Sequence, residues 1–169
     1  ETNELHTYIR GDDGAVRDLF RGIMARVTGD GSTIIFSRNK PDTFDWDILT
    51  RDMDGGEETE KVLVATPGLD WWPRLSPDER FLAYSSDETG HYEVYLTTFP
   101  DAKTRWQVST DGGEWPHWRG DGKEIYYTTN EEIWAADVDM AGGLVLGTPH
   151  VLFRRLATNW SSQWADGFD

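Results

Sequence analysis

Three basic side chains stand at equivalent places along this sequence. Arg26, Arg74 and His117 each lie between two apolar residues and four residues before an aspartate. Gathered at one place, such groups can receive a carboxylate, an acidic peptide stretch or the loop of a partner protein. A second interpretation is that each basic group pairs with an acidic neighbour such as Asp70 or Glu114. The chain has 31 acidic and 16 basic residues, and this surplus favours the pairing.

The three stretches belong to an internal repeat that decides how these side chains are positioned. Their turn aspartates, Asp30, Asp78 and Asp121, are 48 and 43 residues apart. A short run rich in β-branched and aromatic residues follows each turn, and two more strand-like runs complete each unit. A period in the forties made of four short strands is typical of a β-propeller blade. We therefore predict an all-β fold, a β-propeller made of four-stranded antiparallel blades.

The repeat divides a single domain, residues 1–169, into whole and partial blades. Residues 1–22 are predicted to form the two outer strands of an opening partial blade. Three whole blades are predicted next, at residues 23–70, 71–113 and 114–156. Residues 157–169 then begin a further blade or supply a closing strand.

The second strand of the opening partial blade has an alternative. Val16, Leu19, Phe20 and Ile23 recur at helical spacing, which also fits a short helix.

Two segments carry a recognisable motif: residues 72–87, WPRLSPDERFLAYSSD, and residues 108–118, VSTDGGEWPHW. Both resemble the TolB-type, WD-like β-propeller repeat, which occurs in TolB and in extracytoplasmic regions of bacterial receptor-like Ser/Thr kinases. The first whole blade departs from the family pattern, because Met24 and Ala25 replace its Trp-Pro pair, and Glu79 replaces the turn glycine of the second. The resemblance implies a bacterial protein in the periplasm or another extracytoplasmic place, with a propeller used for binding or gating.

The predicted blades do not fill a ring of the usual size. A propeller usually has about four to eight blades, and this chain has three whole ones with partial blades at both ends. Three explanations are open: a piece of a larger propeller, a small four-bladed ring closed by both termini, or a homodimer in which two chains complete one larger propeller. We favour the piece and the paired half, because six to eight blades are usual, by resemblance, for these repeats.

The innermost strand of each propeller blade lines the central channel, so Arg26, Arg74 and His117 are expected to face it. Trp71 is the extra aromatic beside Trp72 and is expected to be the more exposed of the two. Exposed Trp and Arg are common at binding hot spots, although tryptophans between blades more often serve as packing wedges. We therefore expect a non-catalytic module that binds a protein, peptide or small anionic ligand at the channel mouth.

The alternative function is an accessory or gating propeller of a peptidase whose catalytic domain lies outside this chain. The chain itself has no Gly-x-Ser-x-Gly, phosphate-loop or His-Glu-x-x-His motif, so we predict that it is not an enzyme. The net charge of −15 argues against nucleic acid as a partner. Without an apolar run of about 18 residues, this chain is not expected to insert into a membrane.

One acidic turn partly resembles a calcium loop. Asp52 and Asp54 precede two glycines and two glutamates, and carboxylate oxygens are ligands that calcium prefers. A hairpin turn explains the same residues more simply. No cofactor is expected, and Asp52 and Asp54 are the candidate ligands for calcium.

Overall fold

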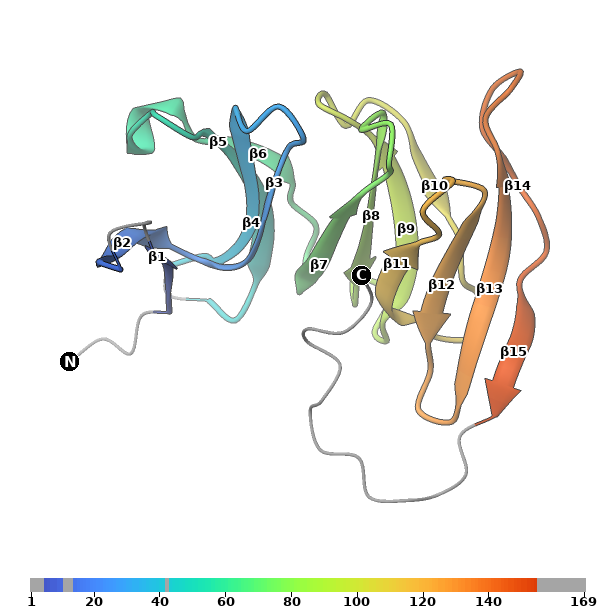
Figure 1. The fold of residues 1–169 in the computed structure, drawn as a ribbon. Coiled ribbons are helices and arrows are strands. Elements are labelled where there is room, and N and C mark those ends of the chain that lie inside the picture. The colour runs from blue at the N-terminus through green and yellow to red at the C-terminus, as the bar shows by residue number, and fades with distance from the viewer. Residues whose placement is uncertain (1–4, 11–13, 42, 155–169) are drawn as a thin grey trace.

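The polypeptide forms a series of antiparallel sheets that follow one another along the chain (Figure 1). The computed structural model describes residues 5–10, 14–41 and 43–154. The first sheet has two strands, β1 (His6–Arg10) and β2 (Val16–Arg21). Residues 16–21 are thus extended, and the helical alternative for this segment is wrong. The predicted closing segment, residues 157–169, lies outside the described residues.

The next two sheets are four-stranded, with their strands in sequence order. We call them the first and second blades. The first contains β3 (Ile23–Val27), β4 (Thr33–Asn39), β5 (Trp46–Asp52) and β6 (Lys61–Val64), with a 3-10 turn at Glu57–Thr59. The second contains β7 (Asp70–Leu75), β8 (Phe81–Ser86), β9 (Glu93–Thr98) and β10 (Arg105–Gln107).

The third blade differs at its outer edge. It contains β11 (Glu114–Trp118), β12 (Glu124–Thr128), β13 (Glu132–Asp139), β14 (Val145–Leu146) and β15 (His150–Arg154). Both β14 and β15 pair with β13, one at each end of that strand. The fourth position, predicted as one strand, is therefore divided between two short strands.

Apolar side chains from neighbouring sheets meet to form the core. Between the first and second blades, Ile35 and Ile48 pack with Leu82 and Tyr84. Successive side chains of a strand point to opposite faces of the sheet. Ala83, which lies between Leu82 and Tyr84 in β8, therefore packs on the other side of the second blade.

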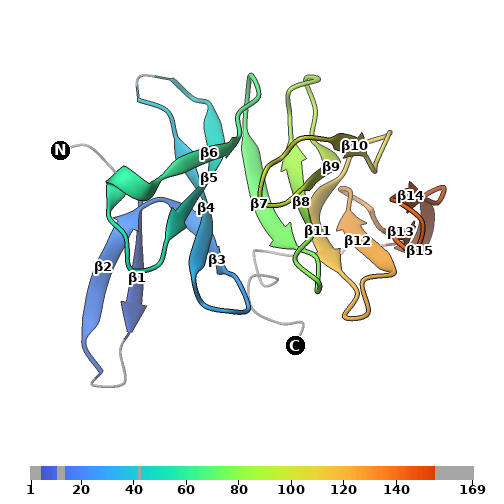
Figure 2. The same ribbon diagram turned by 90° about the horizontal axis from the view of Figure 1, so that it is seen from above.

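The remaining two contacts between sheets are built in the same way. Between the second and third blades, Ala83 and Leu96 pack with Ile125 and Ala136. Phe20 of β2 packs against Phe36 of the first blade, with ring centroids 4.3 Å apart. The all-β propeller architecture predicted from the repeat is confirmed, and Figure 2 shows the β1–β2 sheet and the third blade at opposite ends of the series.

Candidate functional site

The innermost strands of the three blades share one irregularity. Pairing of β3, β7 and β11 with the next strand shifts register just before Arg26, Arg74 and His117, respectively. Each strand therefore has a β-bulge, a feature that bends a strand and re-aims the side chains beside it. The same local geometry precedes all three basic residues.

Each bulge contains a residue in the left-handed backbone region, two positions before the basic residue. Met24, Trp72 and Trp115 have φ values of 58°, 54° and 58°. Residues other than glycine rarely adopt this conformation, and it costs about 1–3 kcal/mol where surrounding structure enforces it. Its occurrence in three blades shows that the bulge is part of the repeat. Nothing in the sequence alone, where Met24 stands in place of Trp, predicted this backbone feature.

The three basic side chains lie within electrostatic reach of one another. Burial and the positive charge of Arg26 lower the pKa of Arg74 to about 10. Burial, followed by the charges of Arg74 and Arg26, lowers the pKa of His117 to about 4. The indole Nε1 of Trp118 donates a hydrogen bond to the Arg74 carbonyl oxygen at 3.1 Å, which joins β11 to β7. Arg26, Arg74 and His117 thus form one group, which we call the cationic cluster.

Neither acidic neighbour considered from the sequence neutralises Arg74. Asp70 is fully buried, and its carboxylate accepts hydrogen bonds from the Thr66 amide and hydroxyl, each at 2.8 Å. Burial raises the pKa of Asp70 and also that of Glu114. In residues 5–10, 14–41 and 43–154, Arg74 forms no ion pair, and its Nη1 donates only to the Pro73 carbonyl oxygen at 3.3 Å. The pairing of Arg74 with Asp70 or Glu114 is therefore wrong.

Aromatic rings pack beside the cationic cluster. Trp72 is 6% exposed and stacks on Trp115, with centroids 4.6 Å apart. Trp71 lies edge-on to both Trp72 and Trp46, at 5.2 and 5.6 Å, and tilted against Tyr92 at 6.4 Å. Trp71 is partly exposed and Trp72 is buried, so Trp71 is the more exposed of the two, as expected from the sequence. Sequence reasoning also missed Trp46 and Tyr92, because both lie in other strands or loops than the repeated motif.

The buried indole groups add to the donors in this region. The Nε1 atoms of Trp71 and Trp72 are shielded from solvent and have no hydrogen-bond acceptor in the described structure. An indole N–H can only donate, so each ring leaves one buried donor without an acceptor among the described residues.

The calcium candidate does not gain further ligands. Asp52 ends β5, Asp54 follows in the turn, and both are exposed. The Gly55 amide donates to the Asp52 carbonyl oxygen at 3.0 Å, as expected for a hairpin turn. Among the residues that the structure describes, no three His, Asp or Glu side chains lie close enough to hold a metal ion.

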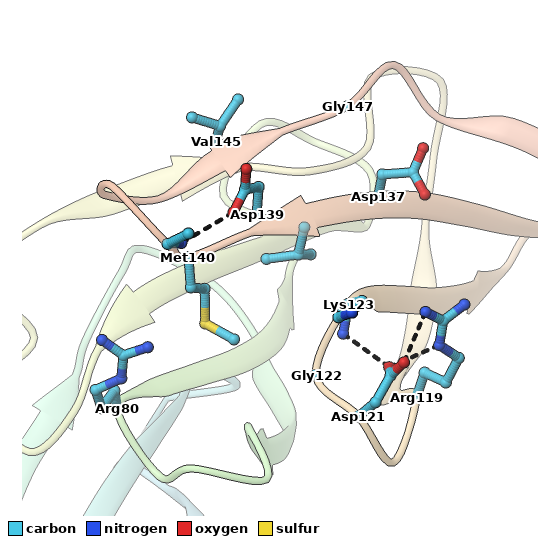
Figure 3. A pocket seen from close by; sticks show the side chains of 12 residues that line it. Arg80, Arg119, Asp121, Gly122, Lys123, Asp137, Asp139, Met140, Val145 and Gly147 are labelled. Carbon is cyan, nitrogen blue, oxygen red and sulfur yellow. Dashed lines mark hydrogen bonds and ion pairs between the residues drawn. The ribbon is translucent and has the colours of Figure 1, made fainter.

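A cavity of about 770 Å³ lies away from the cationic cluster, beside the turn between β11 and β12 (Figure 3). Asp121 there accepts hydrogen bonds from Arg119 Nε and Nη2, at 2.6 and 2.8 Å, and from the Lys123 amide at 3.0 Å. These bonds hold the pKa of Asp121 at about 2, with the Arg119 bond the largest cause. Two of the charged side chains drawn in Figure 3, Arg119 and Asp121, thus bind each other and stabilise the turn to which both belong.

Comparison with known proteins connects this geometry to a family of propellers. No family model matches the chain. It is 29% identical over 104 residues to the Tol-Pal system protein TolB of Anaeromyxobacter dehalogenans (strain 2CP-C), covering 57% of this chain and 23% of that protein. No helix in the described part of the chain is long and apolar enough to cross a membrane.

Solved structures agree with the sequence match. A putative TolB from Agrobacterium tumefaciens is similar with a TM-score of 0.68 and 19% identity, over 91% of this chain and 58% of that one. A puromycin-hydrolyzing peptidase from Mycobacterium tuberculosis is similar with a TM-score of 0.62 and 16% identity, over 83% of this chain and 26% of the peptidase. The chain thus spans less than two thirds of these relatives. The resemblance to TolB-type propellers is confirmed.

Proposed function

We propose that this chain, whose fold is that of TolB-type propellers, is a non-catalytic interaction module that binds a carboxylate-bearing protein or peptide at Arg26, Arg74 and His117. The observation that carries the proposal is the half-buried guanidinium of Arg74, which lies beside two other basic residues and has no acidic partner in the described structure. Removing a charge from water without a counter-charge is costly. A bound carboxylate would offset that cost.

The chemistry of the cationic cluster suits a carboxylate. An arginine guanidinium presents paired N–H donors that match the two oxygens of a carboxylate. With a pKa of about 4, His117 is neutral at pH 7 and offers a hydrogen bond without adding a third charge. Two arginines and one imidazole can therefore surround one or two carboxylates without a large excess of positive charge.

The charge of the whole chain limits how such a partner binds. A net charge of −15 repels an acidic partner at long range, so attraction arises only close to the cluster. Specific hydrogen bonds, and not long-range steering, would then dominate affinity. We also propose the periplasm or another extracytoplasmic compartment as its location, which rests on the family resemblance alone.

A second candidate function is an accessory propeller of a peptidase. It is supported by the similarity to the puromycin-hydrolyzing peptidase, of which this chain covers 26%. Such a propeller would also bind acidic peptide segments through the cationic cluster. The two candidate functions therefore share the binding site and differ only in whether a catalytic peptidase domain is joined to the propeller.

Calorimetric titration with hexaglutamate tests the binding proposal. We expect the wild-type chain to bind the peptide and the R26A/R74A double variant to lose most of that affinity, with a smaller difference at high salt. Arg80→Ala is the matched control, because Arg80 is an exposed arginine that pairs with Asp78 in its own turn at 2.6 Å. Equal binding by the wild type and the double variant would contradict the proposal.

A further inference from the structure

Exposed apolar side chains are concentrated at the two ends of the blade series. The second blade, which has a blade on each side, exposes no large apolar side chain. By contrast, of the ten large apolar side chains exposed in the described structure, seven lie in or next to β1, β2, β14 and β15. These seven are Leu5, Tyr8, Val16, Val145, Val151, Leu152 and Phe153. Exposed apolar surface is thus concentrated on the sheets at the two ends of the described series.

The exposed face of the β1–β2 sheet follows from its register. Thr7 pairs with Phe20, whose ring packs toward the first blade. The next residue, Tyr8, pairs with Asp18 and therefore lies on the opposite face, as does Val16. Tyr8 and Val16 are 60% and 58% exposed. We call this surface the leading face.

The third blade has an equivalent surface at the other end. Ile125 and Tyr127 pack toward the second blade, so Tyr126 between them lies on the far side. In β13, Trp134 and Ala136 pack toward the second blade, which places Ile133 on the far side as well. Ile133 pairs with Phe153, which is 66% exposed. We call this surface the trailing face.

The charges of the two faces are complementary. On the leading face, Asp18 is 2.8 Å from His6, whereas the exposed Arg10, opposite Val16, has no ion pair in the described structure. On the trailing face, the exposed Asp137 pairs in register with Glu124 and also has no ion pair among the described residues. Each face thus presents exposed aromatic surface, with a basic residue that lacks an ion pair on the leading face and an acidic one on the trailing face.

We propose that a second copy of this chain covers both faces, the trailing face of each copy packing on the leading face of the other. Twofold pairing forms the two contacts together and leaves neither apolar face exposed to water. Tyr8 and Phe153 then supply aromatic contact area, and Arg10 meets Asp137. The contact extends the packing that already joins neighbouring blades within the chain. It does not depend on carboxylate binding by the cationic cluster.

Light scattering of the purified chain, from low micromolar to near-millimolar concentration, tests this pairing. We expect the wild type to reach twice the mass of one chain, while Tyr8→Asp and Phe153→Asp each reduce the mass toward that of a single chain. Val62→Asp is the matched control, since Val62 is 59% exposed on β6 and lies on neither face. It should leave the mass unchanged.

Mixing the two variants distinguishes face-to-face exchange from other dimers. The Tyr8→Asp chain keeps an intact trailing face and the Phe153→Asp chain keeps an intact leading face, so the mixture should form a weaker pair of one chain of each kind. A wild type that stays monomeric at every concentration, or variants that still dimerise, would overturn the proposal. Hexaglutamate binding by monomeric Phe153→Asp would show that the cationic cluster works independently, so the two proposals fail separately.

Discussion

Trp72 and Trp115 stack with ring centroids 4.6 Å apart and planes inclined by 23°. Both residues have a left-handed backbone, and each stands two positions before a basic residue of the cationic cluster. Stacking between neighbouring blades therefore joins the two bulges that present Arg74 and His117. The aromatic packing and the position of the basic side chains are parts of one arrangement.

Replacing Trp72 with alanine tests this dependence. The side chain is 6% exposed, so truncation should lower the free energy of unfolding by about 3–5 kcal/mol. Urea unfolding measures the loss. Phe44→Ala is the control, because Phe44 is 95% exposed and should change stability by less than about 0.5 kcal/mol. Similar values for the two variants would show that the stack contributes little.

Arg74→Met separates binding from stability. A half-buried cation without an acidic partner is unfavourable, so we expect the variant to be as stable as the wild type or about 1 kcal/mol more stable, while hexaglutamate binding is weakened. Arg38→Met is the contrast, because Arg38 Nη2 donates to Glu60 at 2.7 Å and its loss leaves that largely buried carboxylate without this partner. That variant should lose about 3 kcal/mol. A large destabilisation by Arg74→Met would mean that Arg74 is structural.

The low pKa of His117 predicts how stability depends on pH. The unfolded state binds this proton near pH 6.5, whereas burial and the nearby arginines delay protonation of the folded state to about pH 4. The contribution of His117 to folding is therefore complete above about pH 6.5 and decreases as the pH falls toward 4. Unfolding free energies of wild type and His117→Asn, measured from pH 7 to pH 4, should reveal a steeper decline in the wild type. Parallel curves would contradict the shifted pKa.

Gly22 joins the β1–β2 sheet to the first blade and should not tolerate a side chain. Its φ is 153°, and an added Cβ would lie 2.6 Å from the Phe36 ring and 3.1 Å from the Ser37 carbonyl oxygen. We expect Gly22→Ala to destabilise the fold by about 1–3 kcal/mol. Gly14→Ala is the control for backbone strain alone, because Gly14 has a φ of 74° with no atom within 4 Å of the added Cβ. If thermal unfolding shows that Gly22→Ala and Gly14→Ala lose the same amount of stability, then crowding against Phe36 is unimportant.

The sequence predicted the blades because each repeat contains its own apolar strands and turns, which depend mainly on local pattern. It also placed Arg26, Arg74 and His117 in register. The bulges were not predictable, since Met24 and Trp72 differ in side chain and share only a backbone conformation. The lack of an acidic partner for Arg74 was not predictable either. Asp70 is close to Arg74 in the sequence, but in the structure its carboxylate accepts hydrogen bonds from Thr66 instead. Such choices among partners depend on packing in three dimensions.

The divided outer edge of the third blade limits how copies of this chain can associate. An uninterrupted edge strand exposes a row of amide and carbonyl groups to which strands of other molecules can be added without limit. Here β14 and β15 occupy opposite ends of β13, with residues 147–149 between them, and β14 has only two residues. A fibril would have no continuous template at this edge. Open-ended addition of strands is therefore disfavoured at this edge, whereas the proposed pairing through the leading and trailing faces would end once both faces are covered.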